Sequence, residues 1–141
     1  NLDREQADRL GVRAVSKAEL LTRSDFVSIH YKPSDRSRGF IGEEELKLLG
    51  PAGYIVNTSR AEIIDQAALL RCLNDGSLGG LATDVYTNEP ADNQNELVSQ
   101  PKVLATPHIG YCTEETSTIF YREMLAAFEA FKGGQPTNVI S

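Results

Sequence analysis

The sequence predicts an α/β fold with a doubly wound parallel sheet, and two features of its 141 residues lead to that prediction. Short apolar, partly β-branched runs alternate with segments of helical periodicity, as in parallel strands joined by right-handed helical crossovers. Several of these runs are followed at once by polar side chains. Because ligands bind at the carboxyl ends of parallel strands, we expect the functional site at that edge of the sheet, with helices on both faces.

The apolar runs place the strands. Tyr54, Ile55 and Val56 follow Gly53 as a strand that is covered on both faces would, and the chain turns polar directly afterwards. The other runs share this pattern of a short apolar core between turn residues. The predicted strands are residues 25–31, 53–59, 79–86 and 102–109, with a further brief strand at 12–15.

Capping residues place the helices. Ser16 and Glu19 form a capping box that opens a helix to about residue 23. Asp65 caps the helix that follows the strand at 53–59. Two short helices are expected at 3–10 and 43–49.

The last predicted helix is the longest and begins after Thr113, which can cap it. It runs to about residue 131, and its large apolar side chains recur at helical spacing. We expect this stripe to be core and not a cofactor site. Its members are Phe120, Met124, Phe128 and Phe131.

Composition excludes several classes of protein. Apolar residues make up 40% of the chain and charged residues 24%, as in a soluble globular domain. The net charge of −6 argues against a nucleic-acid partner, and no apolar run approaches the ~20 residues that span a membrane. We expect a cytoplasmic protein with no metal site, in which Cys72 and Cys112 are reduced packing residues. A disulfide between the two cysteines is the less favoured alternative.

Four polar residues fall at or just beyond predicted strand ends: Arg60, Asp84, Glu89 and His108. A histidine beside a carboxylate can carry a proton near neutral pH, and an arginine fork can grip a carboxylate from two sides. Together they suit the reduction of a 2-oxo acid, for which a cofactor must supply the hydride. From its own stretch of sequence alone, Arg60 is about equally well explained as an ordinary surface arginine and as a ligand-binding residue.

Three motifs make the assignment more specific. The segments NTSRAEIID, TDVYTNEP and TPHIGYCTEE closely resemble the three signatures of the D-isomer-specific 2-hydroxyacid dehydrogenases, in order and over essentially the whole chain. The resemblance implies an enzyme that uses NAD or NADP to interconvert a 2-oxo acid and a D-2-hydroxy acid, as a homodimer when full-length. It implies that Arg60 binds the substrate carboxylate and carbonyl, that His108 is the acid/base, and that Glu89 is its partner.

The resemblance also implies a cofactor site at the nicotinamide end. The residues it assigns to that site come from the ends of the predicted strands. They are Tyr31, Thr58, Ser59, Arg60, Asp84, His108, Ile109, Gly110 and Tyr111.

The chain departs from the family pattern in three places. Ala61 stands where the family usually has glycine, so a positive φ there would be strained. The family often has proline two residues after His30, whereas this chain has Lys32 and then Pro33. No GxGxxG segment occurs to hold a pyrophosphate.

The missing glycine motif suggests a fragment: a partial doubly wound parallel sheet of the Rossmann type without its first two strands. The resemblance implies that the four strands at 25–31, 53–59, 79–86 and 102–109 lie side by side in one contiguous half-sheet with its own covering helices. Residues 1–132 would then be a partial dinucleotide-binding domain with the catalytic residues, and 133–141 would lead back to a substrate domain. We expect this chain alone to be inactive and to bind the cofactor weakly. We expect the exposed sheet edge at 25–31 to be covered by another copy of the chain. Residues 1–15 should be either mobile or packed in a position that they do not have in the family.

Two other classes of protein are the alternatives. A nucleotide-sensing or corepressor-like module could share the fold, but it would not need Arg60, Glu89 and His108 together. A hydrolase with a His–carboxylate pair would need a nucleophile on a sharp turn such as GxSxG, and the sequence contains none.

Overall fold

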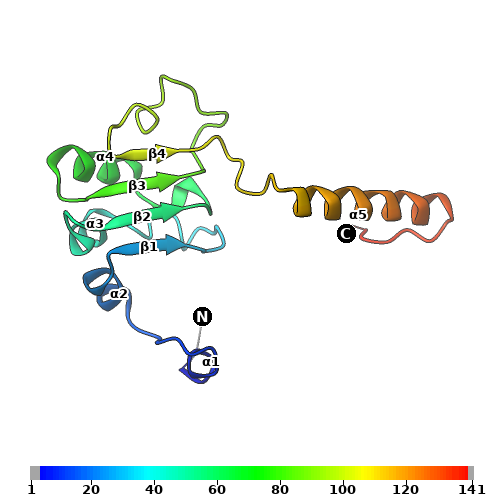
Figure 1. The fold of residues 1–141 in the computed structure, drawn as a ribbon, viewed down its shortest axis with the longest axis horizontal. Helices are drawn as coiled ribbons and strands as arrows, with labels where there is room; N and C mark the ends of the chain where they lie inside the picture. Colours follow the sequence, from blue (N-terminus) through cyan, green and yellow to red (C-terminus); the bar gives the residue numbers. More distant parts are fainter. Residues whose placement is uncertain (1–3, 140–141) are drawn as a thin grey trace. The chain divides into compact units, whose positions relative to one another are not determined.

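The computed structural model describes residues 4–139 and divides into two compact units, one up to His108 and one from Ile109 onward. The first unit contains the sheet and most of the helices, and the second contains a single long helix (Figure 1). The predicted boundary between residues 132 and 133, which concerns a substrate domain, stays a prediction.

The first unit is built on a parallel sheet of four strands, as predicted. The strands lie side by side in chain order, β1-β2-β3-β4, and all point the same way (Figure 1). They are shorter than the predicted runs, since residues at both ends of each run lie outside the ladder. Their bounds are β1 Phe26–Ile29, β2 Tyr54–Asn57, β3 Gly80–Thr83 and β4 Val103–Ala105.

The helices of this unit begin where their caps predict. Ser16 Oγ accepts from the Glu19 N–H at 3.1 Å, and Asp65 Oδ1 accepts from the Ala68 N–H at 2.9 Å. The Glu19 carboxylate pairs with arginines instead of returning to the cap, so only half of the predicted capping box forms. The elements are α1 Arg4–Arg9, α2 Lys17–Arg23, α3 Glu43–Leu49, the 3-10 turn η1 Ala61–Ile63 and α4 Gln66–Asp75.

The predicted strand at 12–15 is wrong. Residues 12–15 lie in irregular chain between α1 and α2, and the Val12 side chain is half exposed. A strand needs a neighbour to receive its backbone hydrogen bonds, and the sheet described here ends at β1.

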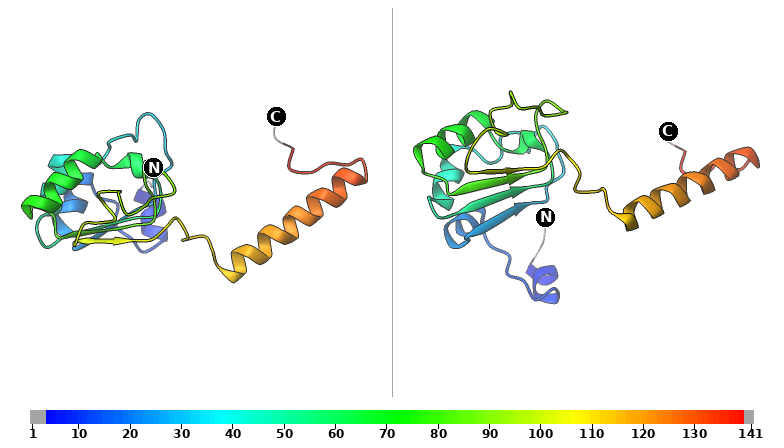
Figure 2. Two further views of the ribbon diagram at one scale, coloured as in Figure 1. Left: turned by 90° about the horizontal axis from the view of Figure 1, so that it is seen from above. Right: turned by 45° about the horizontal axis from the view of Figure 1, so that its top comes forward.

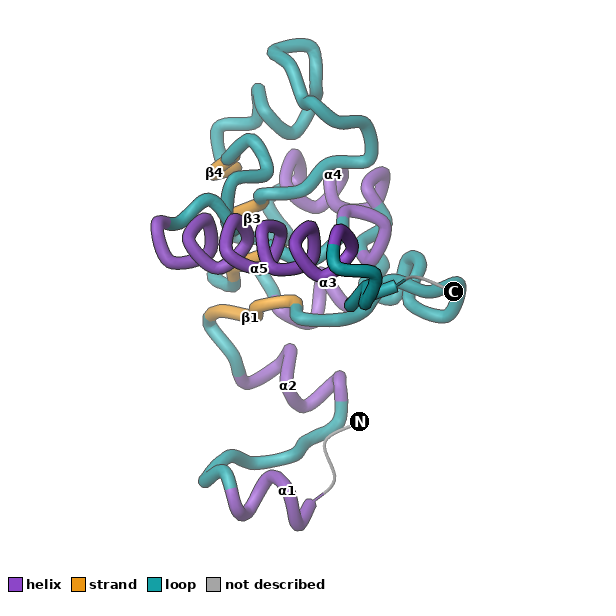
Figure 3. Tube along the Cα trace, turned by 90° about the vertical axis from the view of Figure 1, so that its right-hand side faces the viewer, coloured by secondary structure: helices purple, strands orange, loops and turns teal. Residues whose placement is uncertain are grey.

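Helices α2, α3 and α4 cover one face of the sheet (Figures 2 and 3). The strands advance in one direction, so their right-handed crossovers all return on the same side. The core therefore lies between this face and the helices. Its largest fully buried apolar side chains are Leu21, Leu46, Ile55, Ile63, Leu73 and Leu78.

The expectation of helices on both faces is not met within this unit. On the other face Phe26 and Leu104 are 68% and 70% exposed, and the rings of Phe26 and Tyr54 stack with centroids 5.2 Å apart. Right-handed crossovers place helices on both faces only if the strand order reverses direction within the sheet. The order of these four strands advances in one direction only.

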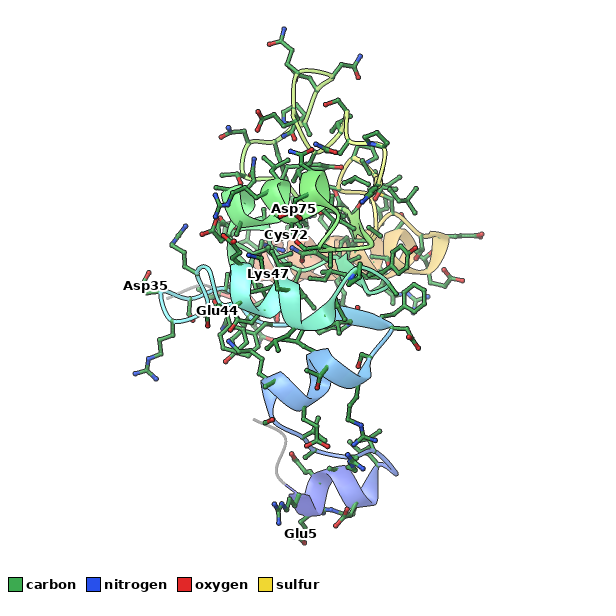
Figure 4. All side chains as sticks on the ribbon, turned by 90° about the vertical axis from the view of Figure 1, so that its left-hand side faces the viewer. Glu5, Asp35, Glu44, Lys47, Cys72 and Asp75 are labelled. Atoms are coloured by element: carbon green, nitrogen blue, oxygen red, sulfur yellow. The ribbon has the colours of Figure 1, made fainter. Side chains whose placement is uncertain are left out.

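Polar side chains join α3 to α4 on the helical side. The Glu43 carboxylate of α3 accepts from Lys47 at 2.7 Å and from Arg71 of α4 at 2.9 Å. Lys47 lies beside Cys72 and Asp75 of α4 (Figure 4). Cys72 is a free, fully buried thiol, as predicted.

The second unit is organised around α5, Glu114–Lys132, which begins at its predicted cap, Thr113. The prediction that its apolar stripe is core is wrong: Phe120, Met124, Phe128 and Phe131 are all exposed. No second layer exists within residues 109–139 against which one helix could bury a face. Cys112 is a free, exposed thiol, so the expectation that it packs is also wrong. None of the helices among residues 4–139 has the length and apolar character that crossing a membrane requires.

Candidate active site

The polar residues singled out in the sequence lie at the carboxyl edge of the sheet. Arg60 follows β2, Asp84 follows β3 directly, and His108 comes three residues after β4. Glu89 lies in the loop that leaves β3. Parallel pairing places these strand ends at one edge, so residues up to 48 positions apart in the chain (60 to 108) lie at the same edge of the sheet.

The structure brings His108 and Glu89 into direct contact. His108 Nδ1 lies 2.7 Å from Glu89 Oε2, and Glu89 Oε1 accepts from the Tyr86 N–H at 2.9 Å. Both side chains are about one third exposed, 34% and 35%, so solvent can still reach the pair. Each carboxylate oxygen thus has its own donor, which fixes the orientation of the carboxylate toward the imidazole.

The charge on Glu89 sets the tautomer of His108. The Tyr86 N–H and then the His108 ring hold the pKa of Glu89 below its usual value, and the positive charge of Arg60 adds to the effect. An ionised carboxylate can only accept hydrogen bonds, so Nδ1 of His108 carries a proton and donates it to Glu89. Proton exchange with a substrate then falls to Nε2.

The backbone of His108 has an unusual conformation. Its φ is +57°, in the left-handed region that residues with a Cβ rarely adopt, and its N–H donates to Thr106 O at 3.1 Å. Such a conformation persists only where surrounding contacts hold it.

Arg60 lies in a turn held by a buried amide. Asn57, 2% exposed, donates from Nδ2 to Arg60 O at 3.0 Å and accepts at Oδ1 from the Ser59 N–H at 3.1 Å. The Arg60 side chain is exposed, and its Nη1 donates to Ser59 O at 2.7 Å. Ala61 opens η1 without a positive φ, so the strain expected there does not arise.

Asp84 is a buried carboxylate beside this edge. It is 5% exposed, its Oδ1 accepts from Thr106 Oγ1 at 2.5 Å, and its N–H donates to Asn57 O at 3.0 Å. The charge is therefore stabilised by a hydroxyl donor, which avoids the cost of an unpaired buried carboxylate.

The remaining predicted cofactor residues lie in two places. Ser59 Oγ donates to Tyr31 O at 2.6 Å and so ties the end of β2 to the end of β1, with Thr58 exposed beside it. Three residues that follow His108 in the chain belong to the second unit, where Cys112 N–H donates to Ile109 O at 2.9 Å. These three are Ile109, Gly110 and Tyr111.

Three further residues, which the sequence did not single out as functional, support the site. Asn57 holds the Arg60 turn, Thr106 donates to Asp84, and Tyr86 contacts Glu89. The signal in the sequence that could have identified Asn57 was a polar residue at the end of an apolar strand.

Among residues 4–139 there is no group of three His, Cys, Asp or Glu side chains that could hold a metal ion.

The sequence matches a known family model over residues 1–110, described as the NAD binding domain of D-isomer specific 2-hydroxyacid dehydrogenases. A glyoxylate reductase of Aeropyrum pernix is 36% identical over 141 residues, which cover 98% of this chain and 42% of that protein. A glycerate dehydrogenase of Methylorubrum extorquens is 34% identical over 123 residues, covering 86% and 39% of the two chains. This chain thus spans about two fifths of the length of these relatives.

Solved structures agree with this similarity. A D-lactate dehydrogenase from Aquifex aeolicus, complexed with NAD and lactic acid, superposes with a TM-score of 0.79 at 29% identity, covering 94% of this chain and 44% of that one. A phosphoglycerate oxidoreductase from Vibrio cholerae O395 has a TM-score of 0.79 at 36% identity, covering 89% and 42%.

Proposed function

This chain belongs to the D-isomer specific 2-hydroxyacid dehydrogenases, and we propose that the whole protein transfers a hydride between a nicotinamide cofactor, NAD or NADP, and a 2-oxo acid or D-2-hydroxy acid. The observation that carries this proposal is the Glu89 carboxylate, which contacts Nδ1 of His108 at 2.7 Å and the Tyr86 N–H at 2.9 Å. This arrangement is what a general acid/base at the carboxyl edge of a sheet requires.

His108 moves the proton. In the reducing direction, its Nε2 donates a proton to the oxygen that was the carbonyl of the 2-oxo acid. In the oxidising direction, Nε2 takes the proton from the hydroxyl of the 2-hydroxy acid. Glu89 orients the ring, because its carboxylate accepts the proton on Nδ1 and leaves Nε2 to face the substrate.

Arg60 binds the substrate anion. Its side chain is exposed beyond the end of β2, and its positive charge contributes to lowering the pKa of Glu89. A planar fork can hold the carboxylate of a 2-oxo acid and polarise the neighbouring carbonyl. Asn57 fixes the turn from which this side chain extends, through its contacts with Arg60 O and Ser59 N.

The chemistry of Asp84 fits a nicotinamide. A carboxamide offers two N–H donors, and Asp84 offers acceptor oxygens at the same edge as His108. The other cofactor contacts that we propose are the remaining residues that the resemblance assigns to the nicotinamide end. They are Tyr31, Thr58, Ser59, Arg60, His108, Ile109, Gly110 and Tyr111. When bound, the nicotinamide supplies or accepts the hydride, which no side chain can do.

The substrates we propose are small 2-oxo acids, and we propose a homodimer for the whole protein. Relatives named glyoxylate reductase, glycerate dehydrogenase and D-lactate dehydrogenase support acids with short side chains. The whole protein, assayed with glyoxylate, hydroxypyruvate and pyruvate in the presence of NADH or NADPH, should oxidise the cofactor with at least one of them. Absence of turnover with all three acids and both cofactors would overturn the proposed function.

A further inference from the structure

We propose that Tyr86 is a positioning residue that holds both members of the His108–Glu89 pair, a role that rests on the proposed function. Tyr86 follows Asp84 by two residues and precedes Glu89 by three, in the loop that leaves β3. Its backbone contacts one member of the pair, and its side chain contacts the segment that carries the other.

The first contact is with Glu89. The Tyr86 N–H donates to Glu89 Oε1 at 2.9 Å, while Glu89 Oε2 faces His108. This backbone donor is the largest cause of the lowered pKa of Glu89. It keeps the carboxylate ionised and aimed at the imidazole.

The second contact crosses to the end of β4. The Tyr86 hydroxyl donates to Thr106 O at 3.0 Å, and the same carbonyl oxygen accepts from the His108 N–H at 3.1 Å. The hydroxyl therefore fixes the carbonyl on which the backbone of His108 is held. Because His108 has a φ of +57°, it depends on such contacts to keep its conformation.

Thr106 is anchored on its other sides as well. Its N–H donates to Thr83 O at 3.0 Å, and its Oγ1 donates to Asp84 at 2.5 Å. Tyr86 completes this arrangement from the loop after β3. The phenol connects the segment that carries Glu89 to the segment that carries His108, across 20 positions of sequence between Tyr86 and Thr106.

The surroundings of Tyr86 keep its hydroxyl a donor. The residue is 7% exposed. Burial raises the pKa of the phenol, and the negative charges of Asp84 and Glu89 raise it further. The hydroxyl thus stays protonated over the pH range in which His108 and Glu89 would work.

Tyr86→Phe removes the hydroxyl and keeps both the ring and the backbone N–H. Tyr54→Phe is the matched control, because Tyr54 is 43% exposed on the open face of the sheet and lies outside the proposed site. In the whole protein, Tyr86→Phe should lower kcat roughly 10-fold, as expected for a misplaced acid/base, and leave KM for acid and cofactor unchanged. Tyr54→Phe should change neither quantity.

A spectroscopic measurement on the 141-residue chain tests the same inference without turnover. The chain has two histidines, so ¹⁵N spectra of the imidazole rings should resolve His108 and use His30 as an internal reference. In the wild type, the His108 signals should be those of a ring protonated at Nδ1. In Tyr86→Phe they should move toward a mixture of tautomers, while His30, and His108 in Tyr54→Phe, stay unchanged.

Wild-type tautomer signals together with wild-type kcat in Tyr86→Phe would overturn the proposal. If Tyr86→Phe does not fold, Tyr86→Met fills a similar volume without a hydroxyl, and the same two outcomes decide. Wild-type whole protein that reduces no 2-oxo acid would instead overturn the proposed function, and the tautomer measurement would still decide the role of Tyr86.

Discussion

At the scale of single residues, Arg60 presents a guanidinium with one nitrogen, Nη1, already donating to Ser59 O. Lysine keeps the positive charge at this position but has no planar fork. We expect Arg60→Lys in the whole protein to lower kcat/KM for the 2-oxo acid about 10- to 100-fold, the effect of losing a hydrogen bond to a charged group. The affinity for the cofactor should change much less.

Arg71→Lys is the matched control for this substitution. Arg71 also uses its fork, on the Glu43 carboxylate, but on the helical side and away from the proposed site. Steady-state kinetics of the two variants decide the matter. An unchanged kcat/KM in Arg60→Lys would remove Arg60 from the substrate site.

His108 is the second residue with a sharp prediction. Asparagine can still accept or donate a hydrogen bond near Glu89, but it cannot exchange a proton near neutral pH. His108→Asn should lower kcat about a hundred- to ten-thousand-fold and leave the far-UV spectrum and thermal unfolding close to wild type. His30→Asn is the control, since His30 contacts Ser28 Oγ at 2.8 Å and lies outside the proposed site. Comparable turnover in the two variants would assign the acid/base role elsewhere.

The sequence could predict which residues follow the strand ends, but not the hydrogen bonds that hold these residues in position. Arg60, Asp84 and His108 follow apolar runs, so their common edge follows from parallel pairing. The contact from Tyr86 to Thr106 O depends on how a long loop folds back over β4, and no local periodicity encodes it. The buried Asn57 side chain likewise acts on a turn whose shape the sequence did not give.

At the scale of elements, one ion pair joins α2 to α3. Lys17 Nζ lies 2.7 Å from Glu45 Oε1, and Glu45 Oε2 accepts from the Gly42 N–H at 2.9 Å. The Lys17 contact lowers the pKa of Glu45 from its ordinary 4.5. A carboxyl with a lowered folded-state pKa stabilises the fold above its unfolded-state pKa, and this contribution is lost as the pH falls through the folded-state value.

Glu45→Gln should therefore destabilise the chain at about pH 7, by about 1 kcal/mol or less, and should have little effect at about pH 3. Urea unfolding of both proteins at the two pH values measures the difference. Glu44→Gln, on the exposed side of α3 and without an ion pair in the part of the chain that is described, controls for the loss of one carboxylate. A difference between wild type and Glu45→Gln that does not depend on pH would contradict the role of this pair.

Caps predicted helix starts better than apolar stripes predicted burial. Ser16, Asp65 and Thr113 cap the helices that begin after them, because a cap is satisfied by backbone donors within three residues. The stripe of α5 has the same periodicity as a core helix, yet it is exposed. Burial depends on whether another layer is present, and periodicity carries no information about that.

At the scale of the whole molecule, the sequence predicted a parallel sheet but not its single covered face. The order β1-β2-β3-β4 advances in one direction, and this order places α2, α3 and α4 together. A pattern of alternating strands and helices does not contain the strand order, but the family resemblance implied that these four strands lie side by side, and the structure confirms it. The predicted cover of the β1 edge by another copy stays a prediction.

The affinity of the 141-residue chain for the cofactor depends on whether the chain contains a segment that binds the pyrophosphate. The 141 residues contain no GxGxxG segment, and backbone N–H groups of such a segment hold the pyrophosphate. We expect calorimetry on the 141-residue chain to give dissociation constants well above the micromolar range for both NADH and NADPH. Micromolar affinity for either cofactor would mean that other residues of this chain anchor the phosphates.

The path of the hydride and the configuration of the product test the proposed chemistry most directly. The whole protein is given pyruvate or hydroxypyruvate, whose reduction creates a stereogenic C2, and NADH or NADPH carrying deuterium at both positions of nicotinamide C4. We expect one deuterium at C2 of the product, a solvent proton on its oxygen delivered through His108, and the D configuration at C2. A product without deuterium at C2, or with the L configuration, would contradict the proposed function.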